Sequence, residues 1–225
     1  MSARTARPRP ADDAFVSTGV LPPSPTVQQA VSDAYERYRT NTDGRLSDVY
    51  PSLAAARPDR FGVCVAGVSG NLYPAGDAEI EFAIMSVAKP FVFTLVCEAV
   101  GPARARECLG VNATGFPFNS VAAIEMSLDG RTNPMVNAGA IAATSLVPGA
   151  TANAKWQAIH EGLSRFAGRE LGLDEDVYAC ASATNHRNRA LAQLLTSCGR
   201  LYFDPIESTD LYTRQSSLRV SARDL

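Results

Sequence analysis

Residues 83–101 are almost entirely apolar and end in glycine, which predicts a helix whose surface is buried. Two polar side chains, Ser86 and Lys89, lie three residues apart at its start. Pro90 follows directly, and proline is tolerated early in a helix, where the backbone N–H has no intrahelical partner. The stretch therefore predicts an apolar helix with Ser86 near its N-terminus.

The spacing of Ser86 and Lys89 suits nucleophilic catalysis. Side chains at i and i+3 share one helix face, so the amine can reach the hydroxyl. A lysine removes a proton only when neutral, which requires a desolvated site that lowers its pKa, and Ile84, Met85 and Phe91 offer apolar surroundings. The alternative is a chance Ser-x-x-Lys at a helix start, with a lysine whose stem packs and whose amine reaches water.

The use of lysine is itself informative. Lysine occurs only at positions 89 and 155, so 19 of the 21 basic residues are arginine. Arginine cannot be deprotonated and cannot act as a base. A chain that otherwise prefers arginine and places Lys89 here fits a requirement for a titratable amine.

Composition narrows the class of protein. With 225 residues, 46% of them hydrophobic, the chain can bury a substantial core, and a net charge of −2 gives no electrostatic case for nucleic acid. Five dispersed cysteines and two histidines provide no metal-ligand spacing, which predicts reduced thiols, no metal and a cytoplasmic location. No apolar run approaches the roughly 18 residues that span a membrane, and the N-terminus lacks a signal peptide's apolar core.

Local patterns predict the order of elements. Residues 1–25 are rich in proline and arginine and are expected to form a flexible tail, with one domain over residues 26–225. Glycine between two apolar runs predicts a β-hairpin over residues 61–76. Helices are expected after an N-cap at Thr26 and over residues 45–50, 103–109, 138–146, 154–169, 187–198 and 210–217, with a further helix beginning at Ser221 and an irregular stretch over 110–137.

Asparagine is dense in the middle of the chain, and positions 119, 133, 137, 185 and 188 are the candidates for recognition. A carboxamide donates and accepts hydrogen bonds at once, which suits recognition of an amide or carboxylate. The alternative is that these residues form turns through local side-chain to backbone bonds. Tyr212 could be a phenolic donor or a core residue, and neither His160 nor His186 is assigned a catalytic role.

Several segments together resemble the serine-dependent glutaminases, which carry a Ser-x-x-Lys motif on a β-lactamase-like fold. The resemblance covers roughly residues 26–225. Its motifs lie at residues 48–51, 59–63, 75–77, 82–91, 115–120, 133–141, 186–192 and 212–225. The family resemblance implies an α+β, β-lactamase/penicillin-binding-protein-like fold, mostly helical here with an incomplete antiparallel sheet.

The resemblance also implies a reaction and a set of residues. L-glutamine is hydrolysed to L-glutamate and ammonia, with Ser86 as nucleophile and part of the oxyanion hole, Lys89 as base and Tyr50 as an active-site tyrosine. The expected substrate contacts are Ser86, Asn137, Asn188 and Tyr212. No cofactor or metal is implied, and a homo-oligomer without nucleic-acid or membrane partners is expected.

Two departures from the family pattern bear on activity. The glutamate that the family places seven residues before its asparagine, to bind the substrate ammonium, is replaced by Ala181. The chain also stops at Leu225, before a second tyrosine, a Lys-Ser-Gly-like strand and further sheet strands, which predicts a domain incomplete at its C-terminus and an exposed hairpin edge.

Three functions follow from these observations. The first is a glutaminase that is weak or inactive in this form. The second is a non-catalytic relative that acts by subunit association. The third is a β-lactam-reactive acyl-serine protein, which shares Ser-x-x-Lys but leaves the asparagine motifs unexplained.

Overall fold

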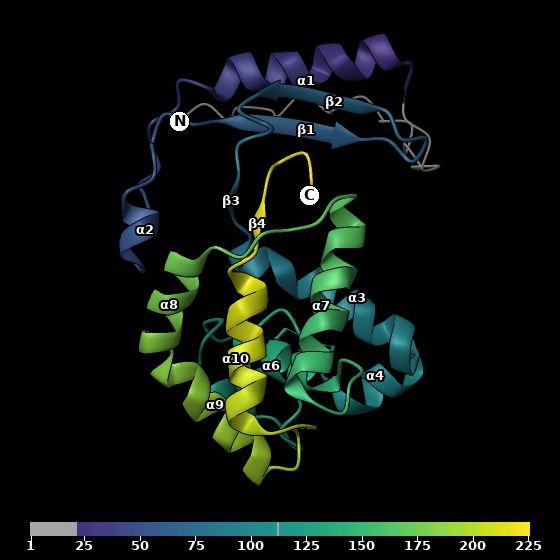
Figure 1. The fold of residues 1–225 in the computed structure, drawn as a ribbon, viewed down its shortest axis with the longest axis vertical. Helices are drawn as coiled ribbons and strands as arrows, with labels where there is room; N and C mark the ends of the chain where they lie inside the picture. The colour runs from purple at the N-terminus through teal and green to yellow at the C-terminus, as the bar shows by residue number, and fades with distance from the viewer. Residues whose placement is uncertain (1–21, 112) are drawn as a thin grey trace, which may run out of the picture.

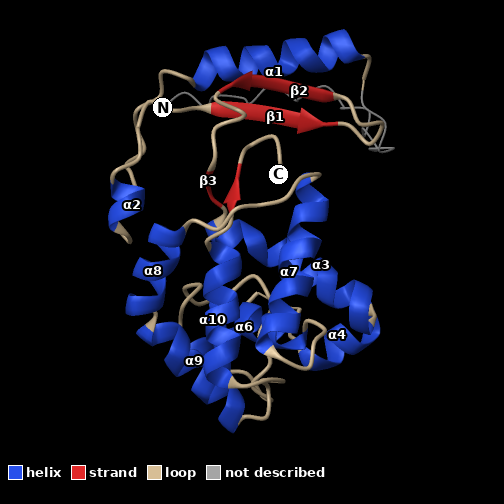
Figure 2. Cartoon of the chain, viewed as in Figure 1, coloured by secondary structure: helices blue, strands red, loops and turns tan. Residues whose placement is uncertain are grey.

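A computed structural model describes residues 22–111 and 113–225. Figure 1 shows helix α1 lying across the β1–β2 hairpin at one end and a body of helices at the other, with β3 and β4 running between them. Figure 2 shows how little of the chain is strand. The architecture is α+β and mostly helical, as predicted.

The described helices and strands take the following order along the chain. They are α1 Ser24–Tyr38, α2 Pro51–Ala54, β1 Gly62–Ala66, β2 Leu72–Gly76, β3 Phe82–Ala83, the 3₁₀ turn η1 Met85–Val87, α3 Ala88–Val100, α4 Pro102–Cys108, α5 Ala122–Glu125, α6 Asn137–Leu146, α7 Ala152–Ala167, α8 Glu175–Thr184, α9 His186–Ser197, α10 Pro205–Ser216 and β4 Arg219–Val220. The strands form two antiparallel pairs, β1 with β2 and β3 with β4.

The predicted hairpin is confirmed, and α1 covers one face of it. Gly62 pairs with Gly76 and Ala66 with Leu72. Val27 and Val31 of α1 pack with Tyr73 of β2 in a small core of their own. The helix lies so close to the hairpin that a Cβ on Gly76 would meet the Tyr35 ring, and the positive φ of Gly76 (65°) also favours glycine.

The helical body is built around α6, whose residues are small enough for close packing. Helix α6 contacts α3, α9 and α10, and Ile141 at its centre is fully buried. A Cβ on Gly139 would lie 2.0 Å from the carbonyl oxygen of Asn133, so only glycine fits there. Close packing fixes α6 against the preceding loop and so fixes the position of its first residue, Asn137.

A charged cluster joins the last residues of the chain to the helical body. Arg169, after α7, forms ion pairs with Asp224 (2.6 Å) and Glu81 (2.9 Å), and Arg223 pairs with Glu79 (3.0 Å). These contacts hold the β4 segment beside β3 and orient the strand that leads into η1.

Two helix starts differ from the predictions because of proline. The helix expected over residues 45–50 is wrong: those residues are irregular, and α2 begins at Pro51 with Tyr50 in an extended conformation. Proline disfavours a helical residue before it and is well placed at the first helical position itself. Proline also begins α10 at Pro205, five residues before the predicted start, with the Asp204 side chain accepting from the N–H groups of Ile206 and Glu207.

Two other boundaries were mispredicted. Helix α1 begins at Ser24 rather than after Thr26, and most of the predicted tail, residues 1–21, lies outside the described residues. At Ser221 the expected helix is a turn. Asp224 does accept from the Ser221 N–H (2.7 Å), as in a capping box, but the same carboxylate also binds Arg169.

Candidate active site

Ser86 lies in the short η1 turn that leads into α3, so its position near a helix N-terminus is as predicted. The residue before it, Met85, has φ 49°, the only positive φ of a non-glycine residue among the residues described. Such a conformation costs about 1–2 kcal/mol for a residue with a Cβ, and such costs concentrate at functional sites. The strained turn marks Ser86, which is exposed and lines a cavity, as the centre of the candidate site.

Asn137 connects the side chains around Ser86. Its Oδ1 accepts from Lys89 Nζ (2.8 Å) and from the Tyr212 hydroxyl (3.1 Å). Its Nδ2 donates to Asn188 Oδ1 (3.0 Å). Because the four residues come from α3, α6, α9 and α10, one carboxamide ties together four helices that are distant in sequence.

Lys89 is held in surroundings that disfavour its charged form. The side chain is only 5% exposed, and its second hydrogen bond goes to the Met135 carbonyl (3.4 Å). Burial lowers the pKa of Lys89 from 10.5 to about 8. The amine also faces the first residue of α6, where the positive end of the helix dipole opposes a nearby ammonium. A neutral amine is therefore accessible near neutral pH.

A cavity of about 450 Å³ lies in front of these residues, within the range typical of small-molecule sites. Ser86, Asn137, Asn188, Tyr212 and Tyr50 all line it. Burial raises the pKa of Tyr212, and the nearby Tyr50 acts in the same direction, whereas a hydrogen bond with Ser86 acts against both. Burial likewise raises the pKa of Tyr50. Both phenols therefore remain protonated hydrogen-bond donors at neutral pH.

Five of the six residues expected at the site line this cavity, and Lys89, which does not line it, is connected to it by its bond to Asn137. The sequence interpretation missed two contributors, Phe118 and the Met135 carbonyl, and named Asn185 only as one of several asparagines. Phe118 has its ring 5.7 Å from Lys89 Nζ, the Met135 carbonyl accepts from the same amine, and Asn185 lines the cavity between α8 and α9. The motif at residues 115–120 was the available signal for Phe118.

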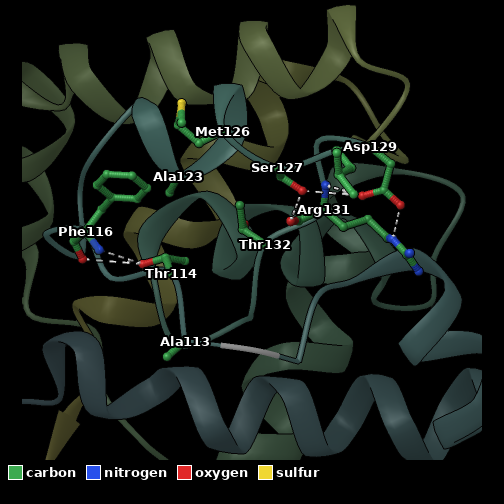
Figure 3. A pocket seen from close by; sticks show the side chains of 10 residues that line it. Ala113, Thr114, Phe116, Ala123, Met126, Ser127, Asp129, Arg131 and Thr132 are labelled. Atoms are coloured by element: carbon green, nitrogen blue, oxygen red, sulfur yellow. Dashed lines mark hydrogen bonds and ion pairs between the residues drawn. The ribbon is translucent and has the colours of Figure 1, made fainter.

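A second cavity, of about 380 Å³, lies on the loop that precedes α6. Figure 3 shows Asp129 and Arg131 directed toward one another at its edge, and their side chains form an ion pair of 2.5 Å. Ser127 donates to the Arg131 carbonyl (2.9 Å). The charged groups at this second cavity pair with each other, so the cavity around Ser86 is the better candidate for an active site.

Metal-ligand clusters and membrane-spanning helices are the two other features considered among the described residues. They contain no group of three or more His, Cys, Asp or Glu side chains placed to hold a metal ion. No single helix in residues 22–111 and 113–225 has the length and apolarity to cross a membrane; residues 85–100 and 102–108 qualify only together and are bent by 115°.

Known proteins resemble this chain over most of its length. The model of the family described as Glutaminase matches residues 44–225. The chain belongs to the glutaminase family. It is 59% identical over 211 residues to Glutaminase 2 of Yersinia pestis, an alignment that covers 94% of this chain and 62% of that protein.

Solved glutaminases have the same fold. The probable glutaminase ybaS superposes with a TM-score of 0.87 at 37% identity, covering 90% of this chain and 65% of the other. Mglu, solved in its tris and glutamate form, gives 0.81 at 30% identity, covering 88% of this chain and 44% of the other. The fold is therefore the β-lactamase-like fold of the glutaminases, as predicted, and this glutaminase-family chain spans less than two thirds of the length of these relatives.

Proposed function

We propose that this chain hydrolyses the side-chain amide of L-glutamine to L-glutamate and ammonia through a glutamyl-serine intermediate. The observation that carries the proposal is the shared cavity of Ser86, Asn137 and Tyr212, with the Lys89 amine bound directly to Asn137. Family membership supports the reaction type, and the related Mglu was solved in a glutamate form.

The reaction proceeds in two stages. Neutral Lys89 accepts the Ser86 hydroxyl proton as Oγ attacks the amide carbon, and the Ser86 backbone N–H stabilises the oxyanion. The C–N bond then breaks, Lys89 returns the proton to the leaving nitrogen, and ammonia departs. Water then attacks the acyl-serine ester and gives one proton to Lys89, which passes it to Ser86 Oγ as the ester C–O bond breaks. The carboxylic acid that forms loses its remaining proton to solvent.

Each remaining side chain has a distinct part in this proposal. Asn137 holds the Lys89 amine and positions it between α3 and α6. Asn188 and Tyr212, bound to Asn137 from two sides, present polar groups to the substrate. Tyr50, which lines the cavity from the residue before α2, supplies a second phenolic donor.

The proposal is tested by ammonia release from L-glutamine. Wild type should release ammonia and Ser86→Ala should not. Ser69→Ala is a matched control, because it makes the same substitution in the exposed turn of the hairpin and should keep wild-type activity. Equal activity in wild type and Ser86→Ala would refute the assignment, as would an inactive wild type with a cooperative unfolding transition.

Three further expectations from the sequence stay proposals. They are a homo-oligomeric state, a cytoplasmic location and the replacement of the ammonium-binding glutamate by Ala181. Light scattering of the purified protein tests the first, since a single species larger than 23.9 kDa is expected. The third bears on which amides the site accepts.

A further inference from the structure

The cavity around Ser86 has two chemically different walls. The wall formed by α6, α9 and α10 carries the hydrogen-bonded groups described above. The residues from α2, α8 and the segment before α2 form a mostly apolar wall, with Val49, Leu53, Val177 and Ala181 beside the hydroxyls of Ser47 and Tyr50. All described residues that line the cavity are uncharged at neutral pH. A substrate that reaches Ser86 with its amide therefore places its other end against apolar and neutral groups.

One polar group beside the apolar wall lacks a partner. Asn185 Nδ2 donates to Thr213 Oγ1 (3.1 Å), but Asn185 Oδ1 is buried without a hydrogen-bond partner in the described structure. An unsatisfied buried acceptor is costly, so a ligand N–H that meets it gains both a hydrogen bond and relief of that cost. Asn185 also lines the cavity, so the contact requires its amide to turn until Oδ1 faces a bound ligand.

These features discriminate between forms of the substrate nitrogen. An ammonium that leaves water is stabilised best by a carboxylate, and no described residue that lines the cavity carries one. Both forms of glutamine carry the same α-carboxylate, so they differ only at the nitrogen. An acylated nitrogen is uncharged, has a single N–H for a single acceptor, and adds an apolar group for Val177 and Leu53 to contact. The cavity, at about 450 Å³, is also large enough for a ligand bigger than a free amino acid.

We propose that this site selects glutamine whose α-nitrogen is acylated, with the amide N–H donated to Asn185 Oδ1 and the acyl group against Leu53, Val177 and Ala181. Selective hydrolysis of such a substrate rests on the amide hydrolysis proposed above. The recognition it describes concerns binding alone and is measurable without turnover.

The test is calorimetric binding of N-acetyl-L-glutamine and L-glutamine to the Ser86→Ala protein, which removes hydrolysis. N-acetyl-L-glutamine should bind at least tenfold more tightly. Adding Ala181→Glu should shift the ratio of the two affinities toward L-glutamine by at least tenfold, because a carboxylate then faces the ammonium. Ala181→Gln is the matched control of equal size and should leave the preference in place.

A second variant tests the acceptor. Asn185→Leu has a similar shape but no oxygen, and it should weaken N-acetyl-L-glutamine binding about three- to tenfold, the range expected for one neutral hydrogen bond. Thermal unfolding confirms that each variant is folded. Tighter or equal binding of L-glutamine, binding of neither amide, or the same shift for Ala181→Gln as for Ala181→Glu would overturn the inference. Selective binding without ammonia release from wild type would instead refute the proposed hydrolysis and leave the recognition standing.

Discussion

Replacing Lys89 by methionine should abolish catalysis and yet stabilise the protein at neutral pH. The side chain is 5% exposed, and burial lowers its pKa from 10.5 to about 8. A difference of this size corresponds to about 3 kcal/mol that the folded state loses by holding an ammonium at pH 7. Methionine fills a similar volume without charge.

The loss of two hydrogen bonds offsets part of this gain, and the longer one, to the Met135 carbonyl (3.4 Å), contributes little. The bond from Lys89 Nζ to Asn137 Oδ1 contributes about 1 kcal/mol, while Asn137 Oδ1 keeps the Tyr212 hydroxyl as a donor. The net expectation is a gain of about 2 kcal/mol at pH 7, or about 4–8 °C in Tm for a chain of this size.

The pH dependence gives the decisive signature. Between pH 8 and 10.5 the unfolded chain keeps the Lys89 proton and the folded chain has released it, so wild-type stability rises with pH across that window relative to Lys89→Met. Urea unfolding of both proteins at pH 7 and pH 10 should therefore show the advantage of the variant disappearing by about pH 10. A variant less stable than wild type at pH 7, or an advantage that does not change with pH, would refute the reasoning.

Lys155→Met serves as the control for that experiment. Lys155 is equally buried, and burial lowers its pKa as well, but its amine donates to the carbonyls of Ser145 (3.0 Å) and Val147 (2.5 Å) at the C-terminal end of α6. These carbonyls would lose their donor and the helix dipole its compensating charge. Lys155→Met should therefore destabilise the protein at pH 7, in the direction opposite to Lys89→Met.

Three further outcomes are expected. If Lys89 is the base, ammonia release should rise with pH through about 8, and a profile flat from pH 6 to 9 would contradict its role. Gly139→Ala should cost about 3 kcal/mol or more in urea unfolding, because its Cβ meets the Asn133 carbonyl, whereas Gly162→Ala meets only a leucine side-chain end and should cost less. For Asp224, burial raises the pKa, but hydrogen bonds with Arg169 and the Ser221 N–H outweigh it, so the pKa lies below its usual value. Its contribution to stability is thus lost as pH falls through that lowered pKa. Asp224→Asn should therefore destabilise the protein by about 1–3 kcal/mol at pH 7 but not at strongly acid pH. The same difference in stability at both pH values would argue against the pairing.

Much of the fold could be predicted because local signals agree with the final packing. The hairpin has glycine in its turn and two apolar strands, and α7 has its Thr151 N-cap and Gly168 after its end. The errors at α2 and α10 arose where Pro51 and Pro205 each begin a helix, which apolar periodicity alone does not reveal. Helix α8 was not predicted at all.

The candidate site likewise has residues that local sequence predicts and residues that only tertiary packing defines. Ser86 and Lys89 form a local motif, and their placement at a helix start follows from sequence spacing. Asn185 could not be distinguished from the other asparagines by sequence. Its amide is oriented by the bond from Nδ2 to Thr213, 28 residues away, which leaves Oδ1 without a partner in the described structure. Hydrogen-bond partners across such separations are set by tertiary packing.

Asn137 has a consequence for the order of events during folding. Its partners lie 48, 51 and 75 residues away in the chain, on three different helices. No segment shorter than residues 89–212 contains all four side chains, so no early local structure can hold the amine in place. If the chain has the proposed activity, ammonia release after denaturation should recover later than helix content, because it requires the last step of assembly.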